Sequence, residues 1–461
     1  AFFHTPLESV IFAQDSALKV MEQWAFAYTR ELNTIEIPAS LQTMGSNAFY
    51  HSGITNVTFA ADSALTEIPE SAFASSALVS VALPDSVTLI NHNAFRDCTY
   101  LQSVDFGGGA DLRLMSNVFY NTGLTSLHIP ANLTYIGEYA FVGLQALEEF
   151  TADENNPEYS VADGILYNKD VSKIIAVPAG RTGSLTLPET LETIGFGAFE
   201  NSCLEEISFD ENSNILSIGY RAFYGADALT EITIPASVVS IDYYAFAMCE
   251  SLETVIFAEG SMLTGVYEGA FYGCTRLKNI LLPDSVREIS DFAFYGCTSL
   301  TELPVSETNR LLGIYSYAFA YTGIEELTLP ETLVDLGEYA FRGARLTKVV
   351  IPGTNREQLL IGIGAFADCG DLSEITLPFI GASFEDTEIT WFGYIFGAGG
   401  YEANSTYVPA SLQTVTLSEG ITFIGAQAFR ELPNIQTINI PHSVRMVYNY
   451  AFYNCLARYE F

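Results

Sequence analysis

Residues 277–297 read LKNILLPDSVREISDFAFYGC. Residues 277–282 follow the pattern Leu-x-x-Ile-x-Leu, in which Ile280 and Leu282 are two residues apart, as on the buried face of a short β-strand. Pro283 follows at once, and because proline has no amide hydrogen to donate, the strand must stop there. Further apolar residues then lead to the dipeptide Ala293-Phe294. The stretch predicts one strand, one turn and one apolar corner.

The corner dipeptide recurs along nearly the whole chain, and most spacings between its phenylalanines are 22 to 25 residues. Once, Val118 replaces the alanine. The phenylalanines concerned are Phe2, Phe26, Phe49, Phe73, Phe95, Phe119, Phe141, Phe199, Phe223, Phe246, Phe271, Phe294, Phe319, Phe341, Phe366, Phe429 and Phe452. A fixed period of this length is typical of repeat architectures.

A unit of about 23 residues cannot bury its own apolar face, so successive units must stack. We therefore predict a repeat solenoid with a parallel β ladder and short helical turns, in about 19 turns of 22–25 residues. Every repeat phenylalanine is expected to be buried. The whole chain, 1–461, is predicted to be a single solenoid.

Two stretches break the period. Residues 150–184 contain Asp163-Gly-Ile-Leu-Tyr167, which predicts a β-hairpin-like insert. Residues 378–411 form a Gly- and aromatic-rich insert around Trp391. Insertions in repeat proteins map to loops on one face, which is often a binding face.

The pattern Leu-x-x-Ile-x-Leu-Pro-x-Ser-Val-x-x-Ile-x-x-x-Ala-Phe-x-x-Cys in 277–297 resembles that of the BspA-like leucine-rich-repeat surface proteins. The resemblance covers nearly every residue and includes the Asp-Gly-Ile-Leu-Tyr insert. It implies a secreted or surface-anchored protein of a host-associated bacterium or a protozoan, often linked to adhesion to matrix proteins. Because ligands differ within this family, the resemblance implies no particular ligand.

The net charge of the chain restricts the partners that it can bind. The chain has 55 Asp and Glu against 19 Lys and Arg, a net charge of −36, which argues against nucleic acid and anionic membranes as partners.

No apolar run reaches the roughly 18 residues of a membrane span, and no signal segment opens the sequence. The protein is therefore either cytosolic or has lost a leader. The chain begins and ends within repeats, so we expect the parent protein to extend further.

Six of the seven cysteines lie three residues after a repeat phenylalanine, and Cys203 lies four after. A single buried structural position explains them all, and we expect free, inert thiols. The sequence has no His-Glu-x-x-His, paired Cys-x-x-Cys or Gly-x-Ser-x-Gly motif. We predict no enzyme activity of those kinds, no metal site and no cofactor.

The outward residues of the strands should form the concave binding face. Glu206 and Glu231 are predicted to hold the same position in neighbouring strands, as are Glu302 and Glu326, and Glu253 lies nearby. Like charges side by side need solvent screening, a cation or a basic ligand. Carboxylates about 5 to 9 Å apart would also suffice for a glycosidase-type acid/base pair.

Ile256 and Leu281 should project outward from adjacent strands, as a small apolar anchor of the kind found at the centre of interfaces. The insert offers a competing site, since long loops in compact folds are often functional. Its aromatic residues either contact a ligand or fill the widened turn. They are Trp391, Phe392, Tyr394, Phe396 and Tyr401.

The expected function is that of an extracellular or cell-surface binding or adhesion protein, monomeric, whose ligand is a host protein or a glycan. Two alternatives stay open. One is a polysaccharide-active enzyme built on a repeat scaffold, and the other is a structural spacer within a larger surface protein.

Overall fold

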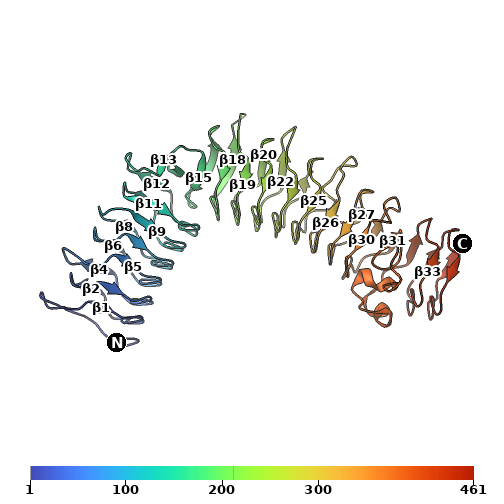
Figure 1. Ribbon diagram of the computed structural model, residues 1–461, viewed down its shortest axis with the longest axis horizontal. Coiled ribbons are helices and arrows are strands. Elements are labelled where there is room, and N and C mark those ends of the chain that lie inside the picture. Colours follow the sequence, from blue (N-terminus) through green and yellow to red (C-terminus); the bar gives the residue numbers. More distant parts are fainter. Residues whose placement is uncertain (1, 211, 461) are drawn as a thin grey trace. The chain divides into compact units, whose positions relative to one another are not determined.

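The computed structural model describes residues 2–210 and 212–460. The chain divides into two compact units, residues 1–214 with 221–228, and residues 215–220 with 229–461. Figure 1 shows short turns stacked in chain order within each unit. The parallel β-solenoid of about 19 turns is confirmed. The single uninterrupted solenoid over 1–461 stays a prediction.

Most turns contribute a first strand, usually longer, and a second, shorter strand, and the two kinds lie in separate sheets that are parallel apart from the insert strands β13 and β14. In unit 1 the first strands are β2 (Thr34–Ile37), β4 (Asn56–Phe59), β6 (Ser80–Ala82), β8 (Ser103–Asp105), β10 (Ser126–Ile129), β12 (Glu149–Ala152), β16 (Gly183–Leu187) and β18 (Leu204–Phe209). The second strands are β1 (Val20–Met21), β3 (Thr43–Met44), β5 (Glu67–Ile68), β7 (Leu89–Ile90), β9 (Leu112–Leu114), β11 (Leu133–Ile136), β15 (Lys173–Ala176) and β17 (Thr193–Ile194).

Unit 2 repeats this plan. Its first strands are β20 (Glu231–Ile234), β22 (Thr254–Phe257), β24 (Asn279–Ile280), β27 (Glu326–Thr328), β29 (Lys348–Val350), β31 (Glu374–Leu377), β32 (Thr414–Leu417), β34 (Thr437–Asn439) and β36 (Arg458–Glu460). Its second strands are β19 (Ser217–Ile218), β21 (Ser240–Ile241), β23 (Gly265–Val266), β25 (Glu288–Ile289), β26 (Gly313–Ile314), β28 (Asp335–Leu336), β30 (Leu360–Ile361), β33 (Phe423–Ile424) and β35 (Met446–Val447).

The segments around the Ala-Phe dipeptides, which we call Phe corners, are hydrogen-bonded turns. Asn93 and Asp97, two residues either side of Phe95, both have φ 59°. This left-handed conformation, which Asn and Asp tolerate best, cannot continue a right-handed helix. The amide of Phe49 donates to the carbonyl of Ala72 in the next turn at 2.7 Å, and His51 donates to Ala74 at 3.0 Å. The corners therefore form hydrogen-bond ladders of their own.

Within each unit, repeat phenylalanines of successive turns stack on one another, and we call this series the Phe ladder. Phe49 and Phe73 lie 5.2 Å apart with ring planes 1° from parallel, and most of the series is fully buried. Three members depart from the expected burial. Phe2 is 41% exposed, and Phe141 and Phe452 are half-buried. Phe2 stacks only on Phe26 within the described residues, and Phe141 borders the first insert, where the repeat is interrupted.

Six cysteines are buried and occupy one structural position, as predicted, but Cys203 is exposed. The thiols of Cys98 and Cys274 donate to the carbonyls of Phe73 and Phe246, each at 3.0 Å. Cys203 comes one residue later in its turn, and Ser202 fills the buried position instead. The prediction of a common position is therefore wrong for Cys203.

We expect one thiol of the native protein to react quickly with an aromatic disulfide reagent, and all seven to react after denaturation. Thiolate is the reactive form, and burial raises the pKa of Cys98 to about 11 and that of Cys369 to about 12. Absorbance at the released chromophore measures the count. Cys203→Ser should remove the fast phase, and its persistence in that variant would contradict the assignment.

Residues 150–184 contain β13 (Tyr159–Ala162) and β14 (Ile165–Asn168), which pair antiparallel through a two-residue turn. Asp163 and Gly164 in that turn have φ 50° and 72°, as a type I′ hairpin requires. Strand β14 also pairs antiparallel with β15, and β15 returns to the parallel ladder with β17.

Residues 378–411 contain the 3₁₀ helices η1 (Phe392–Phe396) and η2 (Tyr401–Ala403) and the short helix α1 (Asn404–Tyr407). The fully buried Asn404 side chain accepts a hydrogen bond from the amide of Gly393 at 2.9 Å and donates to the carbonyl of Ala428 at 3.2 Å. These bonds fasten the insert to the following turn.

Candidate functional site

We call the outward surface of the first strands the strand face; the repeat pattern predicts that it is concave. Glu206 is exposed in β18 and lies opposite Ser184 of β16. Glu231 is exposed in β20 and lies opposite Thr254 of β22. Glu206 and Glu231 belong to different units. Their predicted adjacency therefore stays a prediction.

The structure brings the two predicted apolar residues together. Val255 of β22 pairs with Ile280 of β24, and Ile256 and Leu281 each follow this pair by one residue. Ile256 is 43% exposed and Leu281 is 60% exposed. Side chains alternate between the two sides of a strand, so both project outward at neighbouring positions.

Lysines separate the carboxylates of the strand face. The ammonium of Lys278 lies 2.6 Å from Glu253, and this hydrogen bond lowers the pKa of the Glu253 carboxyl. Lys348 lies opposite both Glu326 and Glu374 in the parallel register, and its ammonium is 3.7 Å from Glu374. The sequence reasoning compared only acidic residues and so missed these lysines.

Glu302 is exposed but lies outside the strands, which corrects its predicted place in a strand. Within the described residues, β27 pairs with β29 and ends its sheet, so Glu326 has no partner strand on the side of Glu302. Pro304 cannot donate to a ladder, and its carbonyl instead accepts from the amide of Leu282 at 2.9 Å. The predicted proximity of the Glu302 and Glu326 side chains stays a prediction.

The aromatic residues of the insert mainly pack on one another. Phe392 and Phe396 are buried, with ring centres 5.4 Å apart, and thus belong to the interior of the insert. Trp391, Tyr394 and Tyr401 are half-buried. The indole of Trp391 donates to the carbonyl of Ala398 at 2.8 Å. This arrangement favours the structural interpretation, in which the aromatics fill the widened turn.

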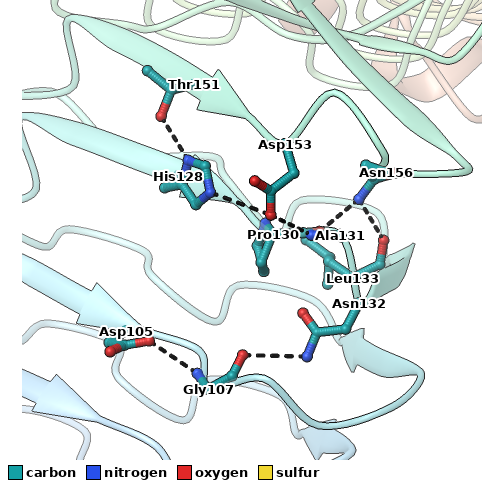
Figure 2. Close-up of polar contacts among 10 residues, drawn as sticks. All are labelled: Asp105, Gly107, His128, Pro130, Ala131, Asn132, Leu133, Thr151, Asp153 and Asn156. Carbon is teal, nitrogen blue, oxygen red and sulfur yellow. Dashed lines mark hydrogen bonds and ion pairs between the residues drawn. The ribbon is translucent and has the colours of Figure 1, made fainter.

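A polar array on β10 and β12, which the sequence reasoning did not identify, is shown in Figure 2. The imidazole Nδ1 of His128 lies 3.0 Å from the Thr151 hydroxyl, and its Nε2 lies 3.7 Å from Asp153. The Asp153 carboxylate accepts from the amide of Ala131 at 2.8 Å. Both His128 and Asp153 are about half exposed. The array orders the turn after β10, where Asn156 also donates to the carbonyl of Pro130 at 2.7 Å.

A buried ion pair in unit 1 was also missed. Glu200 directly follows Phe199, a position that elsewhere holds Ala, Tyr, Arg, Val or Phe. Its side chain is 5% exposed, and Oε1 accepts from Arg221 Nη2 at 2.6 Å. Burial raises the pKa of Glu200 to about 7, although the Arg221 guanidinium lowers it. An acidic residue at a repeat position otherwise free of acids is the signal that could have identified it.

Glu200 also lines a cavity of about 90 Å³. The walls of the cavity include the apolar residues Phe141, Val142, Val177 and Phe196. Two exposed charged residues, Glu138 and Lys173, line the same cavity.

Among the described residues, no group of three His, Cys, Asp or Glu side chains is placed to hold a metal ion. Over those same residues, no helix is both long and apolar enough to cross a membrane.

The sequence profile of the BspA type leucine rich repeat region, in six copies, matches residues 1–111, 112–178, 179–301, 264–389 and 403–459. The sequence matches no curated protein. A leucine-rich repeat protein of Eubacterium ventriosum ATCC 27560 is similar in structure, with a TM-score of 0.55 and 25% identity over 63% of this chain and 83% of that one.

Two further solved structures share 23% identity with this chain. A leucine-rich repeat protein of Bacteroides ovatus ATCC 8483 has a TM-score of 0.47 over 82% of this chain and 85% of its own. A leucine rich cell surface protein of Faecalibacterium prausnitzii A2-165 has a TM-score of 0.46 over 77% and 82%. Since the profile matches nearly every turn, the chain belongs to the BspA-type leucine-rich repeat family.

Proposed function

We propose that this chain is an extracellular or cell-surface binding protein that holds a host protein or glycan against its strand face. The observation that carries the proposal is the exposed pair Ile256 and Leu281 on neighbouring strands. Family membership supports a surface location, because the family resemblance implies secreted or anchored bacterial proteins.

The surroundings of the apolar pair fit an interface. Binding energy is usually concentrated in a desolvated apolar centre, and charged groups at the rim contribute mainly to specificity. Here the Glu253–Lys278 ion pair lies three residues before the apolar pair on both strands, and Glu231 is exposed on the preceding strand. The net charge of −36 favours partners with basic groups.

We expect Ile256→Asp/Leu281→Asp to weaken binding at least tenfold, because carboxylates would be desolvated where the apolar anchors lay. A ligand is first identified with a panel of immobilised extracellular-matrix proteins and a glycan array. The affinity of each variant for that ligand is then measured by surface plasmon resonance. The matched control is Val239→Asp/Leu360→Asp, which changes two exposed apolar residues away from the strand face, one directly before β21 and one in β30. Equal losses in both double variants would mean that added charge alone is responsible.

The insert is the competing site, and Tyr401→Ala tests it without removing Asn404, which fastens the insert. Under the strand-face proposal this variant binds as the wild type does. If Tyr401→Ala weakened binding tenfold and the Ile256/Leu281 variant did not, the binding site would move to the insert.

A further inference from the structure

The cavity beside Glu200 has a clear structural origin. The amide of Phe199 donates to the carbonyl of Ala222 in the next turn at 2.7 Å, and that of Phe95 donates to Val118 at 3.0 Å. One turn before Phe199, it is the amide of Val177 that makes this bond, to Ala198 at 2.8 Å. Val177 therefore holds the ladder position of a repeat phenylalanine.

Valine is smaller than phenylalanine, and the ladder has a gap at this turn. Phe141, on the side of the gap toward the N-terminus, is only half-buried, and its ring meets Phe150 at a tilt of 59° instead of stacking on a following repeat ring. The cavity of about 90 Å³ lies between these turns, lined by Phe141 and Val177. Unfilled volume in a core forfeits packing contacts, which a ligand of matching size would restore.

The second observation is an unsatisfied polar atom at the cavity. Oε1 of Glu200 is paired with Arg221, but Oε2 is buried and, within the described residues, has no hydrogen-bond partner. Glu200 is 92% buried as a residue (8% exposed). Its Oε2 lies 3.1 Å from the position that a Cβ on Gly197 would take, and Gly197 is itself part of the cavity wall. A buried carboxylate oxygen left unpaired costs free energy, which a donor entering the cavity would recover.

The chemistry of the walls selects the ligand. A carboxylate only accepts hydrogen bonds, so the ligand must donate. Two aromatic residues, Phe141 and Phe196, line the cavity, and aromatic rings attract cations to their faces. Nη2 of Arg221 is already paired with Glu200 Oε1, and the two exposed charged residues that line the cavity, Lys173 and Glu138, are of opposite sign. Apolar cavities of about 150 Å³ hold benzene, so this smaller one suits a short alkyl chain.

We propose that this cavity binds a primary alkylammonium group, which donates to Glu200 Oε2 while its alkyl chain lies against Phe141, Val142 and Val177. A free amine and the side chain of a lysine share this chemistry. The site is independent of the strand face, since all of its residues belong to unit 1 and lie outside β16 and β18.

The test is isothermal titration calorimetry of the whole chain at pH 8 with n-butylamine, n-butanol and Nα-acetyl-lysine methylamide as probes. We expect n-butylamine to bind at one site per chain, and n-butanol to bind at least tenfold more weakly because it lacks the charge. The lysine derivative distinguishes the two sources: binding at least as tight as that of n-butylamine indicates a lysine side chain, and weaker binding indicates a free amine.

Glu200→Gln should weaken n-butylamine binding at least tenfold, whereas the control Glu138→Gln at the exposed edge of the cavity should change it less than threefold. Val177→Phe should abolish binding and raise the melting temperature, because it restores the ladder ring. If Val177→Phe fails to fold, Ala179→Leu is the alternative variant that fills the same cavity.

The proposal is overturned if the wild-type protein gives no binding heat up to 20 mM n-butylamine, if n-butanol binds equally well, or if Glu200→Gln binds n-butylamine like the wild type. The Ile256/Leu281 variant should bind the amine normally, which separates this test from that of the strand face.

Discussion

Replacing Phe294 with alanine is expected to lower the local free energy of unfolding by about 3–5 kcal/mol, the usual cost of a large-to-small change in a core. Phe294 is fully buried, and its ring stacks on those of Phe271 at 5.3 Å and Phe319 at 5.1 Å. The substitution removes contacts on both faces of the ring and leaves a cavity that the flanking backbone ladders prevent from collapsing.

Native-state hydrogen exchange is the appropriate measurement, because long repeat arrays need not unfold in one step. The amides of Phe271 and Phe294, which donate to the next turn at 2.8 Å, report on the affected corners. Tyr100→Ala serves as the control, since Tyr100 is 65% exposed and surface changes usually stay within about 0.5 kcal/mol. A loss below about 1 kcal/mol for Phe294→Ala would contradict the role given to the Phe ladder.

The second large effect is a pH dependence that originates at Glu200. Burial raises its pKa from the ordinary value of 4.5 to about 7 in the folded protein. The folded state therefore binds this proton more tightly than the unfolded state does. The resulting stabilisation is fully present below pH 4.5 and is lost as the pH rises to about 7, with a total of about 3 kcal/mol.

Glu200→Gln cannot titrate, so unit 1 of this variant should lack that slope. We expect the variant and the wild type to be similarly stable at pH 4.5, and the variant to be more stable by up to about 3 kcal/mol at pH 8. Hydrogen exchange of unit 1 amides at both pH values measures the difference, without added amine. The exposed Glu138→Gln should follow the wild-type profile. Parallel profiles for the wild type and Glu200→Gln would show that Glu200 ionises freely in the folded protein.

The structural features that recur in every repeat could be predicted from the sequence. The spacing of Ala-Phe and the proline after the first strand predicted the stacking, and the alternation within β2 and β20 is the expected exposed-buried pattern. Departures from the period were not predictable from it. Cys203 is exposed because Ser202 takes the buried position, and that difference of one residue decides which side chain faces the core.

The candidate sites depended on contacts between residues of different turns. The neighbouring positions of Ile256 and Leu281 followed from the repeat alone. The Glu253–Lys278 pair required knowing which lysine lies one turn away. The Glu200 cavity was missed because Val177 belongs to the first insert, where no Ala-Phe dipeptide marks the ladder position. Hydrogen bonds between turns, which the sequence does not display, reveal that position.

The hydrogen bonds of the Phe corners have an electrical consequence. In unit 1 the amides of Phe26, Phe49 and Phe73 all donate to the carbonyl of the turn that follows, so these peptide groups point the same way. Aligned peptide dipoles add along a column, as they do in an α-helix. Here the N–H groups point toward higher residue numbers, so the partial positive charge lies at that end of the column and the partial negative charge at the end near Phe2. The stack of corners thus has a polarity, and a charged group placed at one end of it has a different energy from the same group placed at the other.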